Sequence, residues 1–258
     1  HRNVYIAHCF IYDNPGELNK TNKHSGNGIV VGNTDGVMIE YCVAYNNGAE
    51  NAWLVGGPVG IWCWDSNNAI IQFCEAYQNK TGTTKDGGGL DIDGSCTNSI
   101  MQYNYSHDNE GAGILVAQYT GARRPMKNII VRYNVSQNDG RKNDYGGIQV
   151  WDGNNGDMDS VFIYNNVVYM APNNQANVAA FKCISSNHRN HLISNNVFVT
   201  NNTDGTVSQV DLFPNNGLNF INNFYYDLQN TYRYRDGGIV QNNLAGWRAA
   251  TGDETYNG

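Results

Sequence analysis

The chain has 258 residues and a net charge of −7, from 16 basic and 23 acidic side chains. Only 15% of its residues are charged and the pI is about 5.2, so it lacks the basic footprint with which nucleic-acid-binding proteins neutralise phosphates. The mean hydropathy is −0.52, and no apolar run approaches the ~20 residues that a membrane span needs. We therefore expect a protein with no nucleic-acid partner and no membrane span.

Turn-forming residues dominate the composition. The chain has 29 Gly and 41 Asn, both of which tolerate left-handed backbone conformations and disfavour long helices. At the same time 40% of the residues are hydrophobic and 12% are aromatic, which is too many for a disordered chain. The composition favours an ordered protein built from short strands and tight turns.

An internal repeat runs from the first residues almost to the end. Short apolar segments such as Ile39–Cys42 and Met101–Asn104 each finish on Cys or Asn, and successive segments lie 27 to 33 residues apart. The final column consists of Cys9, Cys42, Cys74, Asn104, Asn134, Asn166, Asn196 and Asn223. A repeat of this period predicts a solenoid of eight coils, in which each coil packs on its neighbours.

A second signature within the coils is Gly followed by alternating apolar residues. It occurs at Gly28–Val31, Gly60–Cys63, Gly89–Ile92, Gly113–Val116 and Gly147–Val150. Alternation with a period of two predicts a strand with one buried face. Stacking the coils places equivalent strands side by side in parallel, roughly 4.8 Å apart.

These strands, together with the apolar-x-x-Asn-x-x-x-x-Asn turn seen at Met101–Asn109, resemble the right-handed parallel β-helix of the pectate-lyase-like superfamily. The resemblance covers roughly residues 3–229. It implies an all-β solenoid of about eight coils with about 30 residues each, Asn ladders buried in the turns, and an active cleft along one sheet. We expect residues 230–258 to form a C-terminal closing segment. Because neither end carries a typical capping repeat, both ends are expected to be cut from a longer protein.

The cysteines fit the repeat better than a disulfide framework. Cys9, Cys42 and Cys74 lie in the ladder column, and Cys63 falls on an inward position. Stacked parallel Cβ vectors suit a disulfide badly, and the chain has no CxxC pair to favour a zinc site. We expect all six to be buried thiols.

The alternate positions of the Gly-Ile-x-Val strands should face outward. They form two columns, Val30, Trp62, Asp91, Leu115 and Gln149, and Gly32, Trp64, Asp93, Ala117 and Trp151. Indole faces stack on sugar rings and are seldom left in water. We therefore predict a glycan-binding face on which three indoles are partly exposed, walled by the long loops that precede the strands. Its predicted substrate-binding residues are Trp62, Trp64, Trp151, Gln149, Gln118, Lys182 and Asp211.

The strongest chemical signal is the pair Asp91 and Asp93, two residues apart on one outward strand face. Glycoside hydrolysis needs two carboxyl groups, one protonated and one ionised. Like charge and aromatic neighbours are expected to raise the pKa of one and leave the other low. Asp86, on the loop entering the same coil, is a third candidate. His107 is expected at the rim of the cleft, where an imidazole can assist proton transfer.

Three functions remain open from the sequence. The favoured interpretation is an extracytoplasmic glycoside hydrolase, secreted, periplasmic or on the cell surface, that acts as a monomer on a poly- or oligosaccharide and requires no cofactor or metal. The second is a polysaccharide lyase, which in this superfamily often uses calcium and a basic residue. Asp86, Asp91 and Asp93 would then hold calcium, and Lys182 would be the base. The third is a glycan-binding or adhesin module without catalysis.

Overall fold

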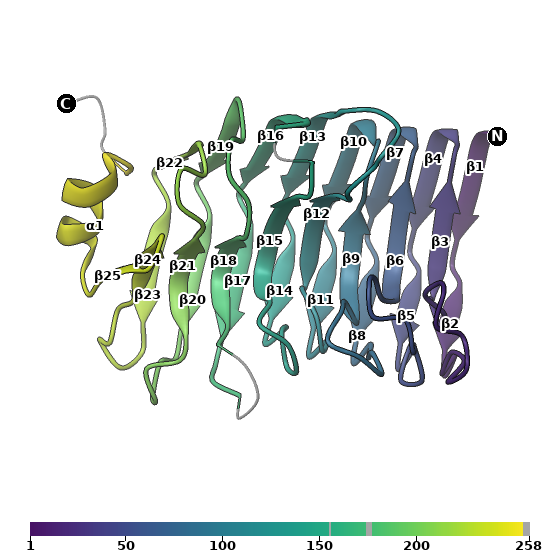
Figure 1. The fold of residues 1–258 in the computed structure, drawn as a ribbon, viewed down its shortest axis with the longest axis horizontal. Coiled ribbons are helices and arrows are strands. Elements are labelled where there is room, and N and C mark those ends of the chain that lie inside the picture. The colour runs from purple at the N-terminus through teal and green to yellow at the C-terminus, as the bar shows by residue number, and fades with distance from the viewer. Residues whose placement is uncertain (155, 174–176, 255–258) are drawn as a thin grey trace.

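The computed structural model describes residues 1–154, 156–173 and 177–254, and within them the chain is a parallel β-solenoid (Figure 1). Three sheets run along the stack, and the chain visits them in turn, coil after coil. The prediction of an all-β right-handed parallel β-helix is confirmed, with about seven turns of ~30 residues where eight coils were expected.

Sheet A contains the repeated apolar segments found in the sequence. The register matches the predicted alignment, because Ile39 pairs with Ile6 on one side and with Ile71 on the other. Its strands are β1 (Arg2–Ala7), β4 (Asp35–Glu40), β7 (Asn67–Gln72), β10 (Thr97–Gln102), β13 (Met126–Arg132), β16 (Met158–Tyr164), β19 (His191–Ser194) and β22 (Leu218–Ile221).

Sheet B follows sheet A after a two-residue turn in each coil, for example residues 41 and 42. The first residue of this turn has a positive φ, as in Tyr41 (53°) and Asn165 (55°), which explains why Asn recurs there. The strands of sheet B are β2 (Phe10–Tyr12), β5 (Val43–Tyr45), β8 (Glu75–Tyr77), β11 (Tyr105–His107), β14 (Val135–Gln137), β17 (Val167–Met170), β20 (Val197–Thr200) and β23 (Phe224–Asp227).

Sheet C is built from the Gly-led alternating segments. The loops that enter it from sheet B all lie along one edge of the stack, the lower edge in Figure 1. Its strands are β3 (Ile29–Gly32), β6 (Val59–Trp64), β9 (Gly88–Ile92), β12 (Ile114–Gln118), β15 (Gly146–Asp152), β18 (Ala179–Cys183), β21 (Ser208–Leu212), β24 (Tyr234–Asp236) and β25 (Ile239–Gln241), of which β25 pairs with β24 antiparallel.

The interior of the coils is filled by stacked apolar side chains and thiols. All six cysteines are free, and Cys42, Cys63 and Cys74 belong to the main core. The predicted Asn ladder is confirmed: the backbone N and the Nδ2 of Asn134 both donate to Oδ1 of Asn166 at 3.0 Å. The same contacts link Asn104 to Asn134. Each amide thus satisfies buried turn backbone, as the position requires.

A second amide ladder follows sheet B. The side chains of Asn47, Asn79 and Asn109 are buried, and each donates to the Oδ1 of the next member at 2.7–3.0 Å. The ladder ends at Asp139, whose Oδ1 accepts from Asn109. This second ladder is the downstream Asn of the sequence motif, and it holds the start of the loops that wall sheet C.

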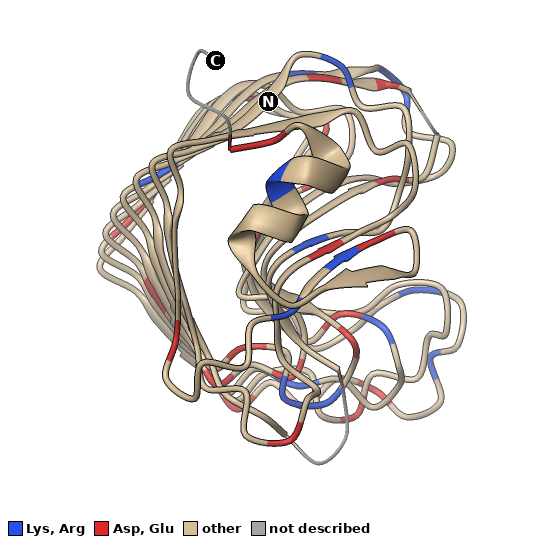
Figure 2. Ribbon diagram, turned by 90° about the vertical axis from the view of Figure 1, so that its left-hand side faces the viewer, with Lys and Arg blue, Asp and Glu red and all other residues tan. Residues whose placement is uncertain are grey.

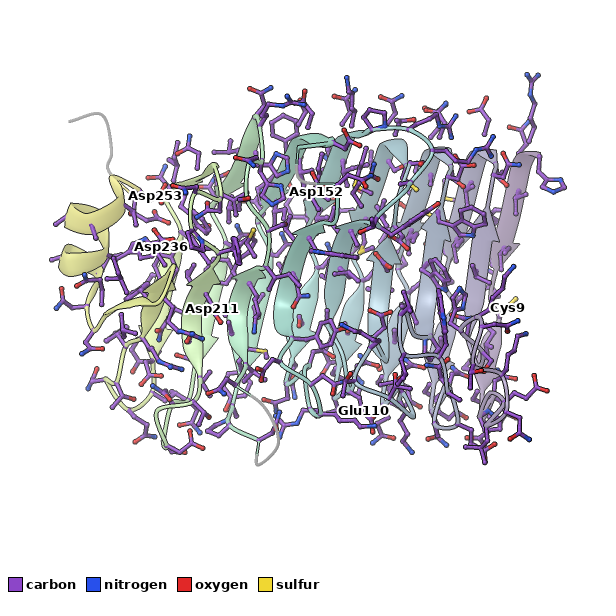
Figure 3. The ribbon with its side chains drawn as sticks, viewed as in Figure 1. Cys9, Glu110, Asp152, Asp211, Asp236 and Asp253 are labelled. Carbon is purple, nitrogen blue, oxygen red and sulfur yellow. The ribbon has the colours of Figure 1, made fainter. Side chains whose placement is uncertain are left out.

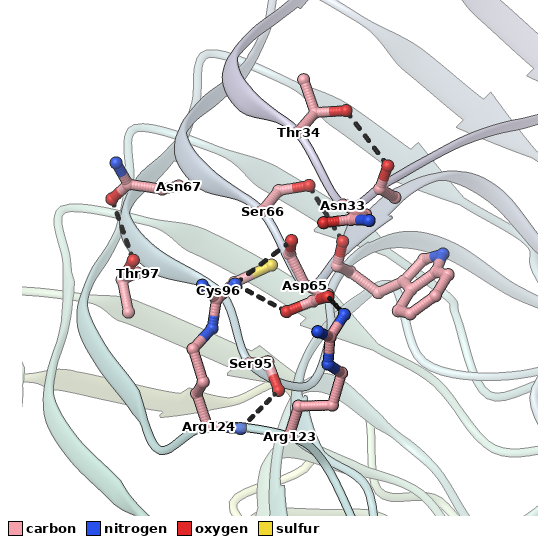
Figure 4. Close-up of polar contacts among 12 residues, drawn as sticks. Asn33, Thr34, Asp65, Ser66, Asn67, Ser95, Cys96, Thr97, Arg123 and Arg124 are labelled. Carbon is pink, nitrogen blue, oxygen red and sulfur yellow. Dashed lines mark hydrogen bonds and ion pairs between the residues drawn. The ribbon is translucent and has the colours of Figure 1, made fainter. Parts of the chain in front are cut away.

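The turn from sheet C back to sheet A is fastened by one buried carboxylate. Asp65, at a φ of 45°, accepts hydrogen bonds from Arg123 at 2.8 Å and from Arg124 at 2.6 Å (Figure 4). The Arg124 backbone N also donates to Oγ of Ser95 in the intervening coil. The loop after β12 is therefore tied across two coils to the turn after β6.

Helix α1 (Leu244–Thr251) covers the C-terminal end of the stack. Figure 2 shows it lying across the interior of the last coil. Trp247 is 1% exposed and packs against Phe220 and Tyr234. Residues 255–258 of the predicted closing segment lie outside the described residues. Within the ranges given above, no helix has the length and apolar character to cross a membrane.

Candidate carbohydrate-binding face

One column of outward residues crosses the whole of sheet C. The strand pairing aligns Val30, Trp62, Asp91, Leu115, Gln149, Lys182, Asp211 and Arg235. Their strand neighbours, such as Ile61 and Cys63, lie in the core. The predicted alternation is confirmed, including its extension to Lys182 and Asp211. Arg235 was missed because residues after 229 were assigned to a closing segment, although the alternation of residues 232–235 continues the pattern.

A second outward column carries the accessible aromatic groups. Trp64 and Trp151 are partly exposed, as predicted, and so is Asp93 between them. The indole of Trp64 lies over Gly32, where an added Cβ would approach its ring to 2.4 Å. The small residue in the preceding coil therefore allows the ring to lie flat on the sheet.

Most of the first column is covered, which corrects the prediction of an open face. Trp62 is only 5% exposed and Gln149 only 2%. The Trp62 indole donates to Oδ1 of Asn27 at 3.0 Å, and the His24 ring packs edge-on against it at 5.3 Å. The exposure predicted for Trp62 is wrong, because the loop before β3 folds over the sheet.

The three predicted carboxylates come together at the strand β9. Asp91 is 3% exposed, and one of its oxygens, Oδ1, has no hydrogen-bond partner among the described residues. Asp93 accepts from the backbone N of Gly94 at 2.7 Å. Asp86 is held from two loops: Oδ2 accepts from Gly57 N at 2.6 Å, and Oδ1 accepts from the Tyr145 hydroxyl at 3.3 Å. The loops that contain Gly57 and Tyr145 therefore hold the Asp86 carboxyl group close to the start of β9.

Burial raises the pKa of all three carboxyl groups. For Asp91 the pKa lies well above its usual value, first because of desolvation and then because of the negative charges of Asp93 and Asp86. Desolvation raises the pKa of Asp93 to about 7, although the Gly94 N–H opposes the shift. The expectation that one of the pair keeps a low pKa is thus wrong, because desolvation raises both pKa values.

The lyase alternative implies a calcium site at the same carboxylates. Among the described residues no group of three or more His, Cys, Asp or Glu side chains is arranged to hold a metal ion. One Asp86 oxygen is occupied by Gly57, and one Asp93 oxygen by Gly94. The calcium site at Asp86, Asp91 and Asp93 that the lyase alternative implies therefore stays a prediction.

His107 lies elsewhere. It ends β11 in sheet B, where its ring stacks on Tyr77 at 4.8 Å and on Tyr105 at 4.5 Å. Its ring nitrogens contact Asp108 at 2.9 Å and Glu75 at 3.3 Å. The structure therefore does not bring His107 to the aspartates of sheet C, and the ring continues a column of stacked tyrosines.

Two glutamines predicted to bind substrate serve the protein backbone. Gln118 is fully buried; its Oε1 accepts from Ser95 N and its Nε2 donates to the Arg124 carbonyl, each at 2.8 Å. The Oε1 of Gln149 accepts from Gly146 N at 3.1 Å. Both amides stabilise the loops beside the face and are withdrawn from solvent.

A hollow of about 380 Å³ opens further along the same column. Asp211, labelled in Figure 3, is one of its lining residues, and Arg235 contacts it at 2.9 Å and Lys182 at 3.5 Å. Two cations thus surround one carboxylate. The hollow is lined by Asp144, Lys182, Cys183, Ile184, Asp211, Leu212, Phe213, Pro214, Arg235, Gly237 and Gly238.

Comparison with known proteins agrees with the fold. Residues 1–122 match the family model described as right handed beta helix region. No curated protein and no solved structure matches the chain. The chain is therefore a right-handed parallel β-helix protein, with a fold consistent with the pectate-lyase-like superfamily.

Proposed function

We propose that the protein hydrolyses a polysaccharide bound along the outward face of sheet C, with Asp91 and Asp93 as its paired carboxyl groups. One observation carries the proposal: two carboxyl groups occupy successive outward positions at the end of β9, with Asp91 inside the strand and Asp93 just after it, and desolvation raises the pKa of both. The fold supports it, since β-helix proteins are often carbohydrate-active. We also propose that the protein works outside the cytoplasm, where such substrates are found.

The different environments of the two carboxyl groups would give them different roles in hydrolysis. Desolvation and the negative charges of Asp93 and Asp86 raise the pKa of Asp91, so it suits the general acid. Asp93 is more exposed and ionises near pH 7, so it suits the base that activates water. We propose inversion, because two outward side chains of one strand need not converge to the about 5 to 5.5 Å of a retaining pair.

Substrate would be held by the groups on either side of this pair. Trp64 and Trp151 are partly exposed in the column that contains Asp93, and indole faces stack on sugar rings. Downstream, Lys182 and Arg235 line the hollow around Asp211. A chain extending from Trp64 past Trp151 to the hollow would cross the acid–base pair.

A lyase is the second candidate, and the hollow around Asp211 favours it. Lyases remove a proton beside a sugar carboxylate and need a base and a cation at that point. Lys182 and Arg235 supply two nitrogen groups about Asp211 in one hollow. In this case Lys182 is the base, and the reaction depends on acidic sugars and on added calcium.

A polysaccharide panel tests the proposal. Neutral and acidic plant and algal polysaccharides are incubated with the protein, and new reducing ends and ultraviolet absorbance are followed together. A hydrolase produces reducing ends without an unsaturated, absorbing product. Asp93→Asn and Lys182→Ala then assign the site, and Asp204→Asn, an exposed loop carboxylate, is the matched control.

The outcomes separate the three functions. Reducing ends that disappear in Asp93→Asn support the hydrolase. An absorbing product that disappears in Lys182→Ala replaces it with the lyase. Quenching of tryptophan fluorescence by an oligosaccharide, with no product of either kind across the panel, leaves a binding module and overturns catalysis.

A further inference from the structure

Two buried imidazoles lie together away from the outward face of sheet C. His188, in the segment that connects β18 to β19, and His191, the first residue of β19, are 4% and 2% exposed, and their ring centroids are 4.8 Å apart. Burial lowers the pKa of each to about 4, so both rings are neutral near pH 7. Neither contacts the proposed hydrolytic pair.

The hydrogen bonding of His191 fixes its tautomer. Its Nδ1 lies 2.7 Å from the carbonyl oxygen of Arg189. A carbonyl only accepts, so Nδ1 carries the proton. The Nε2 atom of the neutral ring therefore presents a lone pair, and among the described residues nothing donates to it.

His188 also has one nitrogen with polar contacts and one without. Its Nε2 lies 2.9 Å from Oγ of Ser185 and 3.4 Å from Sγ of Cys183. Its Nδ1 is buried and, within the described part of the chain, has no partner. When Nε2 donates to Ser185, Nδ1 presents a second lone pair. The Cys183 thiol contacts Nε2 of His188 and therefore does not occupy Nδ1.

Nearby carboxylates favour a cation at the two imidazoles, and a cavity beside His188 gives access to them. The carboxylates of Asp152 (labelled in Figure 3) and Asp159 act electrostatically on the imidazoles in the direction that favours positive charge. His188 also lines a cavity of about 540 Å³. The other lining residues are Gly156, Asp157, Asn187, Arg189, Asn215 and Gly217. Leaving a polar atom buried without a partner costs about 1–3 kcal/mol, so one such atom on each of two neighbouring rings points to a ligand that both can reach.

We propose that His188 Nδ1 and His191 Nε2 bind a late first-row transition-metal ion. Neutral imidazole suits Zn²⁺, Cu²⁺ and Ni²⁺, whereas calcium takes oxygen ligands. Metal-binding histidines characteristically donate their other N–H to a carbonyl or similar acceptor, which is the arrangement found between His191 and the Arg189 carbonyl; His188 adopts it in the tautomer whose Nε2 donates to Ser185. Because no group of three metal-binding side chains is present in the described residues, water entering from the cavity completes the coordination.

The test is Zn²⁺ binding to the metal-free protein by isothermal titration calorimetry. One equivalent should bind to the wild-type chain, and His188→Ala and His191→Ala should each weaken binding at least about tenfold. Ser185→Ala should weaken it less. His1→Ala and His8→Ala are matched controls remote from the pair, and both should leave the affinity unchanged.

A second measurement keeps the test decisive if an alanine variant fails to fold. Cu²⁺ added to the wild-type chain should give an electron paramagnetic resonance spectrum with coupling to two imidazole nitrogens, and Zn²⁺ should raise the melting temperature. Zn²⁺ binding that survives in the folded double variant overturns the site, as does wild-type protein that takes up no ion. Neither result depends on polysaccharide hydrolysis.

Discussion

At the scale of single residues, Asp139 shows how the fold tolerates a buried charge. It ends the second amide ladder: Oδ1 accepts from the backbone N and the Nδ2 of Asn109, and Oδ2 accepts from the Ser136 hydroxyl. The side chain is completely buried. Desolvation raises its pKa to about 6 against the hydrogen bonds that lower it. The earlier coils place neutral amides at the same point of the ladder.

Replacing this carboxylate by the amide of the other coils should stabilise the protein. At pH 8 we expect Asp139→Asn to raise the free energy of unfolding by about 1–3 kcal/mol, since a shift of two pKa units is worth about 2.7 kcal/mol. The new Nδ2 should reach the Ser106 carbonyl, as Asn109 Nδ2 reaches that of Ala76.

The pH dependence gives the sign of the effect. Because the folded pKa of Asp139 is raised, wild-type protein gains stability as the pH falls through about 6 towards the unfolded value near 4. The advantage of Asp139→Asn should therefore shrink between pH 8 and pH 4.5, as measured by urea unfolding at both. A variant less stable than wild type at pH 8 would contradict this account. Asp204→Asn, in an exposed loop, is the control.

Asp91 and Asp93 allow a separate prediction about activity. On the true substrate, each Asn substitution should lower turnover by about a hundredfold or more, a typical general acid–base contribution. With Asp93 as the base, kcat/KM should rise with pH through about 7, and this limb should vanish in Asp93→Asn. Stopped assays across pH 5–9 measure both effects.

The activity of the double variant tests this assignment from the other side. Full activity in the Asp91→Asn, Asp93→Asn double variant would move the chemistry elsewhere, with Asp86 and His107 the next residues to test. Thermal unfolding should change little in either single variant, because Asp91 has an unpaired oxygen that a neutral amide tolerates at least as well.

At the scale of elements, each sheet is held by side-chain ladders as well as by its backbone. In the turn between sheets A and B, Asn134 links three coils: it accepts from Asn104, donates to Asn166, and donates through Nδ2 to the Met101 carbonyl. A single side chain thus satisfies backbone groups on both sides of its own coil. Similar buried amides explain how a chain so rich in Asn can be well packed.

Removing one member of the ladder should therefore be costly. We expect Asn134→Ala to lower the free energy of unfolding by about 1–3 kcal/mol, because buried N–H and C=O groups of two neighbouring coils lose their partners. Chemical denaturation measures the difference. Asn219→Ala, on the exposed side of β22, should change stability by less than about 0.5 kcal/mol. Equal effects of the two substitutions would show that the ladder adds no stability.

At the scale of the whole molecule, the stack is a one-dimensional array in which each coil contacts the next. Such arrays open from their ends, because an end coil has one neighbour in place of two. At the C-terminal end, α1 takes the place of a further coil. Glu254 extends the amide ladder there, since it accepts from the backbone and the Nδ2 of Asn223. This end is therefore covered by both an apolar side chain and a polar partner.

Trp247 should be the main apolar contribution of this cover. We expect Trp247→Ala to cost about 3–5 kcal/mol, the usual range for a buried tryptophan, and to speed hydrogen exchange first in β22, β23 and β24. Exchange in β7 and β10 should be little changed, because the loss is felt by near neighbours. Arg248→Ala, exposed on the same helix, is the control. Uniformly faster exchange along the whole stack would contradict the nearest-neighbour description.

The sequence alone determined the solenoid, its strands and the direction of their side chains. Alternation with period two, and a column repeated about every 30 residues, depend on contacts that recur identically in each coil. The inward position of Cys63, the outward position of Asp91 and the stacking of Asn104 on Asn134 follow from those local rules. For the same reason the alignment extended correctly to Lys182 and Asp211.

Only the tertiary structure decided what covers the face and which groups meet there. The contact of Asn27 with Trp62 spans 35 residues, and that of Asp86 with Tyr145 spans 59. Neither contact recurs from coil to coil, so no column of the sequence reports it. Trp62 pairs with Asp91, which is 3% exposed, and desolvation raises the pKa values of Asp91 and Asp93. Repeated contacts determine the scaffold, whereas contacts that occur once determine the environment of the site.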